Sequence, residues 1–347
     1  MPCGILFVPV CFHLLIDDGV PGLMRYSMYG SLFALLLAGA VVLPSCSPHD
    51  DAPDPESVSD TTVTDALGRT VTISRPVRRV VSLAPNLTEI VYAAGAGSTL
   101  AAVTTADDFP PAVDTLPKVG ALPVDFEAIS AQRPDLVLAT DQINAPREAE
   151  TFDALDVPLY FFSFAEVTDV FEAIRRAGEL LGSPQSSADS AAALEASLHA
   201  LRDRTRAVSD RPRVLVLVGD ETLYAFGGSS YIHTLVEAAG GQSITADLDT
   251  NAPTLTEEYV LTERPDVIIG AWGADYNTDQ LLDLHPTWDV VPAVRNDRIY
   301  SLPGSILLRP GPRLVQGAQA MARRLHPSLF PNAPAEPASS TAPSMDR

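Results

Sequence analysis

Cysteine and lysine are nearly absent from this chain of 347 residues. Its three cysteines, Cys3, Cys11 and Cys46, all lie within the first 46 residues. The rest of the chain therefore contains no disulfide, no thiolate nucleophile and no thiolate metal site. Lys118 is the one lysine, so almost all of the 23 basic residues are arginines.

Positive charge is also scarce, because 44 acidic residues face 23 basic ones and the formal net charge is −21. A charge of this sign opposes binding to nucleic acid and to anionic lipid surfaces. The acids are spread along the chain rather than gathered in one patch for a cationic ligand. We therefore interpret them as an adaptation to high salt, which screens their mutual repulsion.

Several common catalytic motifs are missing as well. The sequence contains no G-x-S-x-G, H-E-x-x-H or P-loop pattern. Gly95 and Gly97 follow a predicted helix rather than a strand, so we expect them to end that helix and not to cradle a phosphate. The sequence therefore favours a protein that is not an enzyme and carries no cofactor of its own.

The amino-terminal region resembles an export signal. Residues 32–43 form an apolar run that is too short to span a bilayer, and it follows a basic start. We assign residues 24–46 to a signal peptide whose end is similar to the lipobox of bacterial lipoproteins, with Cys46 as the lipid-anchor residue. Ordinary cleavage, with Cys46 as a bystander, is the alternative. Residues 1–23 carry two aspartates and are treated as a doubtful extension.

One sequence motif occurs twice in the chain. Asp125–Ala139 reads DFEAISAQRPDLVLA and Thr256–Ala271 reads TEEYVLTERPDVIIGA, so that Glu127 and Glu258 stand 131 residues apart. In each copy a short helical run ends at Arg-Pro-Asp and an apolar strand follows. A repeat of this length predicts two similar α/β lobes, and a cleft between lobes is a common ligand site.

The pattern along the chain predicts an α/β fold in which one long, rigid backbone helix joins the two lobes, with the ligand cleft between them. In the first lobe, Asn86 is expected to N-cap a helix with Glu89 at its third position. The predicted segments are a disordered linker (47–62), an N-terminal lobe (63–183), the backbone helix (184–208), a C-terminal lobe (212–326) and a disordered tail (327–347).

Several segments in one order resemble a known family. They are VVSLAPNLTEIVYAAGAG, LPKVGALPVDFEAISAQRPDLVLA, GGSSYIHTLVEAAGGQSI and LLRPGPRLVQGA. The chain is similar over residues 63–326 to the helical-backbone substrate-binding proteins of ABC importers for vitamin B12, ferric siderophores and haem. In style it is closest to the cobalamin-binding members.

This resemblance implies several properties. The ligand would be a small-molecule metal chelate, either a corrinoid or, alternatively, a ferric siderophore or haem. The partners would be a permease dimer and its ATPase. The protein would be a periplasmic monomer of the cell envelope, attached to the membrane only through its lipid. A surface lipoprotein with no transport role is a further alternative.

The resemblance also assigns site residues. Glu127 and Glu258 would dock into arginine pockets of the permease, although acids in a first helical turn also simply favour the helix dipole. By position, Tyr224 and Arg309 would contact the ligand. Arg313 would be structural, and both arginines could instead pair with local acids.

The tryptophans that grip cobalamin in the family fall here on Ala121, Thr140 and Ala252. Trp272 and Phe109 could rebuild an apolar wall, although an aromatic at a strand end is more often part of the core than of a ligand wall. Two histidines complete the candidates: His233 is expected in the core, and His285 is a weak candidate for an axial ligand of haem iron.

Overall fold

The computed structural model describes residues 59–272 and 276–331. Cys46 and the predicted signal peptide lie outside the described residues. Within those residues, no helix is both long enough and apolar enough to cross a membrane.

An antiparallel hairpin precedes the first lobe. Strand β1 (Ser59–Thr64) pairs with β2 (Thr70–Arg75) through a turn in which Gly68 has φ 76°. A positive φ favours glycine, which explains the residue at this position. Because β1 begins at Ser59, residues 59–62 belong to the hairpin and not to the linker that the sequence predicted.

The first lobe is a five-stranded sheet in the order β5-β4-β3-β6-β7, and all its pairings are parallel. Its strands and helices are β3 (Val80–Ser82), α1 (Pro85–Ala93), β4 (Leu100–Thr104), β5 (Lys118–Val119), α2 (Phe126–Ala131), β6 (Leu136–Thr140), α3 (Glu148–Ala154), β7 (Leu159–Phe162) and α4 (Val167–Leu181).

The second lobe repeats this design with a four-stranded parallel sheet in the order β11-β10-β8-β9. Its strands and helices are β8 (Arg213–Leu217), α6 (Tyr231–Ala238), β9 (Gln242–Ser243), α7 (Glu257–Glu263), β10 (Val267–Gly270), α8 (Thr278–Leu284), α9 (Pro292–Arg295), β11 (Ile299–Ser301), α10 (Gly304–Leu307) and α11 (Leu314–Leu325).

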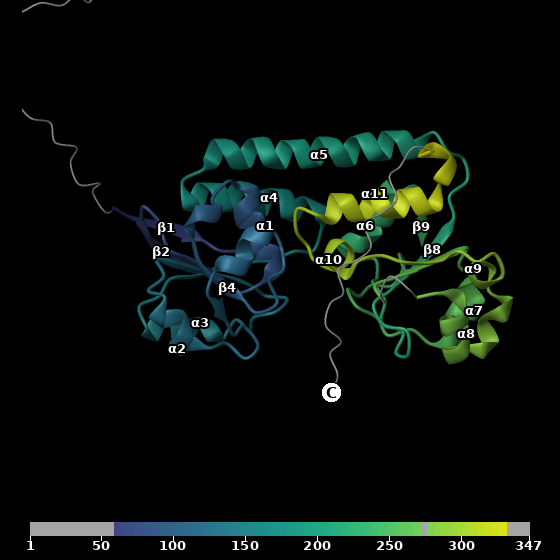
Figure 1. Ribbon diagram of the computed structural model, residues 1–347, viewed down its shortest axis with the longest axis horizontal. Coiled ribbons are helices and arrows are strands. Elements are labelled where there is room, and N and C mark those ends of the chain that lie inside the picture. The colour runs from purple at the N-terminus through teal and green to yellow at the C-terminus, as the bar shows by residue number, and fades with distance from the viewer. Residues whose placement is uncertain (1–58, 273–275, 332–347) are drawn as a thin grey trace, which may run out of the picture. The chain divides into compact units, whose positions relative to one another are not determined.

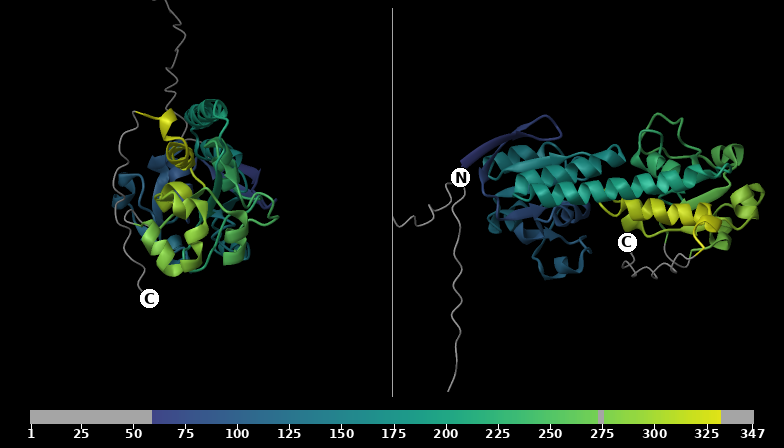
Figure 2. Two further views of the ribbon diagram at one scale, coloured as in Figure 1. Left: turned by 90° about the vertical axis from the view of Figure 1, so that its right-hand side faces the viewer. Right: turned by 90° about the horizontal axis from the view of Figure 1, so that it is seen from above.

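The long helix predicted between the lobes is present as α5 (Pro184–Arg206), with 23 residues. At 1.5 Å per residue it measures roughly 35 Å. It packs on α4 of the first lobe and on α6 and α11 of the second. Figures 1 and 2 show it running across both lobes.

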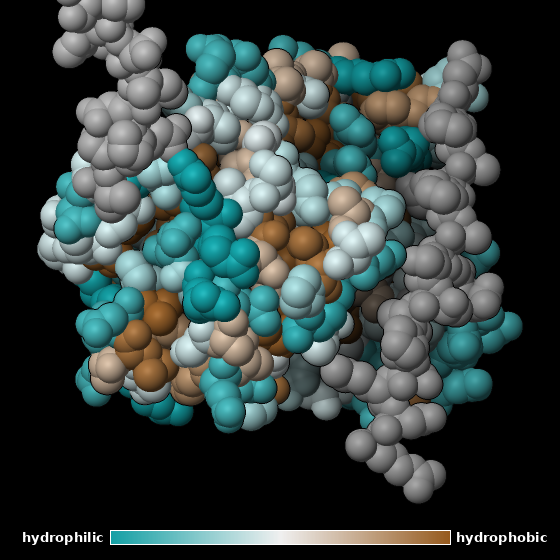
Figure 3. Space-filling model, turned by 60° about the vertical axis from the view of Figure 1, so that its left-hand side comes forward, coloured by the Kyte–Doolittle hydropathy of each residue, from teal (hydrophilic) through white to brown (hydrophobic). Residues whose placement is uncertain are grey.

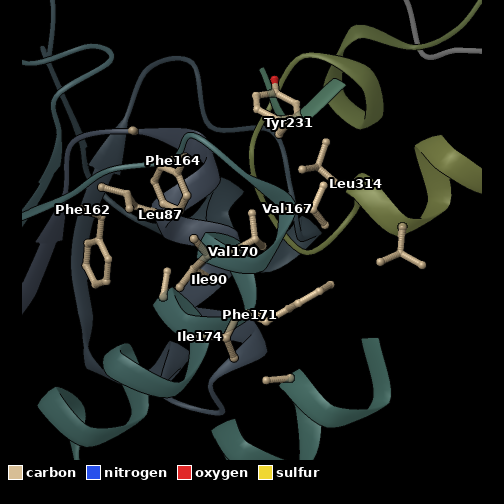
Figure 4. Packing of buried hydrophobic residues seen from close by; sticks show 14 of the residues in the cluster. Leu87, Ile90, Phe162, Phe164, Val167, Val170, Phe171, Ile174, Tyr231 and Leu314 are labelled. Atoms are coloured by element: carbon tan, nitrogen blue, oxygen red, sulfur yellow. The ribbon is translucent and has the colours of Figure 1, made fainter. Parts of the chain in front are cut away.

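One apolar core lies beneath α5 and is continuous between the lobes. It joins Leu87 and Ile90 of α1 and Phe171 of α4 to Tyr231 of α6 and Leu314 of α11 (Figure 4). Each lobe has a second core on the other face of its sheet. Since close-packed interiors resist deformation, the shared core opposes large movements of one lobe against the other.

The repeated sequence motif forms the same structure in both lobes. Arg133 and Arg264 end α2 and α7 with φ values of 47° and 48°. The aspartate two residues later accepts a backbone N–H bond at the start of the central strand: Asp135 from Arg79 and Asp266 from Arg213. The prediction of two related lobes is confirmed at this level of detail.

Those strand-starting arginines complete the motif. The Arg79 guanidinium donates to the carbonyl of Gln132, and the Arg213 guanidinium donates to that of Glu263. Each arginine thereby caps the carboxyl end of the helix before the Arg-Pro-Asp turn. Helix, turn and strand are tied together in both lobes by the same two contacts.

Two local predictions were wrong. Asn86 does not cap α1, because Ala84 is the N-cap and Pro85 the first helical residue. The Asn86 side chain instead donates to the Pro310 carbonyl in the other lobe, 3.2 Å away. The predicted tail also begins too early, since Phe330 lies 4.2 Å from the Arg204 guanidinium of α5.

A stability prediction follows from the contact between α4 and α5. A Cβ atom on Gly178 would overlap Cβ and Oγ of Ser187 and stand 2.9 Å from the Ser183 carbonyl oxygen. We expect Gly178→Ala to lower the free energy of unfolding by about 1–3 kcal/mol, although alanine is the better helix former. Denaturant unfolding measures this change.

Gly304→Ala is the matched control, since its Cβ would meet Ala271 at an ordinary 3.6 Å. It should change stability by less than about 0.5 kcal/mol. Equal stability of the two variants would contradict the close packing of α4 on α5.

Candidate functional site

The four residues predicted to contact the ligand follow strands of the two parallel sheets. Phe109 follows β4, Tyr224 follows β8, Trp272 follows β10 and Arg309 follows β11. In open α/β sheets, ligands bind outside the carboxyl ends of the strands. The structure therefore places these four residues where a ligand site is expected, and their contact with a ligand stays a prediction.

Four large apolar side chains are exposed at these strand ends: Phe109 by 40%, Tyr224 by 51%, Leu122 by 73% and Val218 by 37%. On the face shown in Figure 3, apolar residues reach the surface in patches between hydrophilic ones, so exposure alone does not mark a site. Their shared position after strands distinguishes these four. Leu122 and Val218 were missed, and the strand before Leu122, β5, was itself not predicted because it has only two residues.

Trp272 differs from the other aromatic candidates. Its ring centroid lies 4.4 Å from that of Tyr276, with the two rings tilted by 39°, and the ring folds back over Gly270, beside the second core of that lobe. Within the described residues, its indole N–H has no hydrogen-bond partner. The Trp272 ring is therefore partly buried against the core, and it offers less exposed ring surface to a ligand than Tyr224 does.

An ion-pair cluster joins the lobes beside this edge. Arg313 donates two hydrogen bonds, of 2.6 and 2.9 Å, to the carboxylate of Glu89 on α1. Arg309 donates to both oxygens of Asp108 at 2.5 and 3.2 Å and lies 3.7 Å from Glu89. The Phe109 ring stacks 4.3 Å from the Arg313 guanidinium. Both arginines therefore pair with acids, which was the alternative to ligand binding for Arg309.

The two acids of this cluster differ in how deeply they are buried. The Glu89 side chain is only 2% exposed and that of Asp108 is 58% exposed. Burial raises the pKa of Glu89, and the Arg313 hydrogen bonds and charge only partly offset this rise. Partial burial also works to raise the pKa of Asp108, but the hydrogen bond and charge of Arg309, aided by Arg313, bring it below its usual value.

The histidines do not form a haem-binding group. His285 is buried, with Nδ1 3.1 Å from Glu257 and Nε2 2.6 Å from the Asp220 carbonyl, so both ring nitrogens are occupied. His233 is half-buried rather than in the core, and it lies 3.6 Å from Glu237. Among residues 59–272 and 276–331, no three histidine, cysteine or acidic side chains converge as a metal site.

The repeated glutamates occupy equivalent positions. Glu127 and Glu258 are each the second residue of their helix, α2 and α7, and both are exposed. The neighbouring Glu257 is bound instead to His285 and Thr287. Figure 1 shows α2 and α7 on the side away from α5. Glu258, and not Glu257, is therefore the structural equivalent of Glu127, and the docking role of both stays a prediction.

Comparison with known proteins identifies the family. Residues 80–306 match the family model described as periplasmic binding protein. The chain belongs to the periplasmic binding protein family. This confirms the resemblance and the two-lobed α/β fold predicted from the sequence, and it agrees with a binding protein rather than an enzyme.

Relatives within the family differ in their ligands. An uncharacterised ABC transporter substrate-binding lipoprotein of Bacillus subtilis is 27% identical over 310 residues, 86% of this chain and 98% of that protein. A vitamin B12-binding protein of Vibrio parahaemolyticus is 28% identical over 69% of this chain and 86% of its own length. A periplasmic haem-binding protein of Roseiflexus sp. RS-1 has a TM-score of 0.65 at 28% identity, covering 73% of this chain and 99% of that one.

The buried ion pair predicts an effect of pH on stability. Arg313→Met leaves the Glu89 charge buried with only Arg309 near it, and should lower the free energy of unfolding by about 3 kcal/mol at pH 7. Because the folded-state pKa of Glu89 is raised, protonation relieves the buried charge at low pH. The loss should therefore shrink as the pH falls from 7 to 4, as measured by urea unfolding.

Arg309→Met provides the comparison, because its main partner Asp108 is exposed. Its cost should stay below about 1 kcal/mol at pH 7. A loss for Arg313→Met that is the same at both pH values would show that Glu89 does not carry the effect.

Proposed function

We propose that this protein is the exported binding component of an ABC importer, which captures a corrinoid between its lobes and delivers it to the permease. The chemistry is non-covalent: apolar side chains bury the faces of the ligand and a few polar groups orient it. The shared core beneath α5 supports a largely pre-formed site with little lobe closure.

The pair of exposed glutamates carries this proposal. Glu127 and Glu258 stand at the same helical position in two related lobes, on the side away from α5. A protein with this pseudo-twofold arrangement suits a twofold-symmetric permease, which would receive one carboxylate per subunit. Carboxylate–arginine pairs are strong and directional, and they also steer association.

The ligand is assigned from the apolar strand ends. Phe109, Leu122, Val218 and Tyr224 offer broad apolar contact, which suits the large faces of a corrinoid. The vitamin B12-binding protein of Vibrio parahaemolyticus supports the same class. A haem or ferric siderophore is the second candidate, favoured by the haem-binding relative from Roseiflexus.

We further propose that the protein works as a monomer in the cell envelope, anchored through an acylated Cys46. The lipoprotein relative in Bacillus subtilis supports this attachment. The proposed partners are the permease dimer and its ATPase.

The docking assignment predicts a separation of binding from transport. We expect Glu127→Ala with Glu258→Ala to abolish ligand uptake by vesicles that contain the cognate importer. Ligand affinity should be unchanged, because neither glutamate is among the residues proposed to contact the ligand. Uptake of labelled ligand and calorimetric titration measure the two properties.

Glu257→Gln is the matched control, since it removes a neighbouring acid on the same helix. It should retain uptake. Loss of ligand binding in the double variant, or loss of uptake in the control alone, would contradict the docking assignment.

The ligand assignment predicts one-to-one binding of cyanocobalamin by the purified protein in high-salt buffer, reported by calorimetry or tryptophan quenching. Tyr224→Ala should weaken this binding by about tenfold, because it removes a half-exposed aromatic contact. Leu155→Ala, which removes an exposed leucine after α3, should have no effect.

Parallel titrations with haem and a ferric hydroxamate distinguish the alternatives. Binding of only one of these would keep the importer role and remove the corrinoid. Binding of none would favour a surface lipoprotein without a transport role.

A further inference from the structure

The charged residues around the strand ends are mostly acidic. The segments that follow the strands of both sheets are 105–110, 120–124, 141–145, 163–166, 218–224, 244–254, 271–272 and 302–309. These segments contain eight acidic residues and one basic residue, Arg309; Arg147, the N-cap of α3, and Arg313, the N-cap of α11, lie just beyond them. Close by, Lys118 donates to the Asp107 carbonyl. Arg309 and Arg313 are the arginines of the ion-pair cluster beside Phe109, and Arg309 is the more exposed of the two. An anionic ligand beside Phe109 would therefore meet Arg309 first.

Arg309 is already engaged by an acid of the opposite lobe. Its two terminal nitrogens donate to the two carboxylate oxygens of Asp108, at 2.5 and 3.2 Å. The next guanidinium, that of Arg313, makes two hydrogen bonds to the buried Glu89. These pairs offset the charge of both arginines and use two of the five N–H donors of each.

We propose that Asp108 determines the charge class of the ligand by neutralising Arg309, so that the site takes metal chelates without net negative charge. This inference rests on the proposed function. An uncharged chelate can pack on Phe109 and Tyr224 while the ion pair stays intact. A polyanionic chelate must either displace Asp108 or bind beside it and among further carboxylates, and the repulsion lowers its affinity.

The test compares two ferric complexes of one metal that differ in charge. A ferric tris-hydroxamate is uncharged, and a ferric tris-catecholate carries three negative charges. We expect the purified protein to bind the uncharged complex at least about tenfold more tightly at 0.15 M salt. Asp108→Asn should raise the affinity for the catecholate by about tenfold and leave the hydroxamate within about threefold.

Two further variants separate the role of Asp108 from a general loss of acid charge. Arg309→Gln in the Asp108→Asn background should cancel the gain in catecholate affinity, because the freed guanidinium causes it. Asp141→Asn removes an acid after β6 whose hydrogen bond is to Ser163 and not to an arginine. It should change catecholate affinity by less than about threefold.

The outcomes distinguish this inference from the function on which it rests. If the protein binds neither complex nor cyanocobalamin, the proposed function fails and this inference fails with it. If it binds the catecholate as tightly as the hydroxamate, or if Asp108→Asn leaves the affinity ratio unchanged, the inference is overturned while the binding role stands.

Discussion

The shared apolar core beneath α5 is the constraint on which the rest of the structure depends. Side chains of α1 and α4 meet those of α6 and α11 in one continuous cluster, and α5 covers it. Each lobe alone would leave apolar side chains of these helices exposed. Because the helices of both lobes pack together beneath α5, the close-packed core opposes movement of one lobe against the other.

Charge at the lobe boundary is paired across that boundary. Glu89 and Asp108 come from the first lobe, and Arg309 and Arg313 from the loop before α11 in the second. A buried carboxylate is tolerated only with such partners, because the interior cannot solvate it. In a chain with a net charge of −21, Arg309 and Arg313 therefore lie where carboxylates of the two lobes meet.

Much of the fold could be predicted from local patterns. The apolar strands, the glycine that ends α4 and the proline near the start of α5 are signals read within a few residues. The short strands β5, β9 and β11 were not found, because two or three residues carry too little periodicity to indicate a strand. Asn86 was misread as a helix cap because an asparagine side chain can either cap a helix or bond to another part of the chain. The neighbouring residues do not distinguish these two roles.

The sequence by itself determined the two-lobed α/β architecture, the repeated helix–turn–strand motif and the equivalence of Glu127 and Glu258. Periodicity and turn chemistry act between residues close in the chain, and the constant spacing of 131 residues is visible because the same local motif occurs twice. Only the tertiary structure decided that Arg309 faces Asp108, that Arg313 holds Glu89 and that Trp272 folds onto Tyr276. The two ion pairs join residues about two hundred positions apart, and the Trp272 ring could equally have pointed toward the ligand edge. Packing in three dimensions selects these partners, and local sequence does not encode that choice.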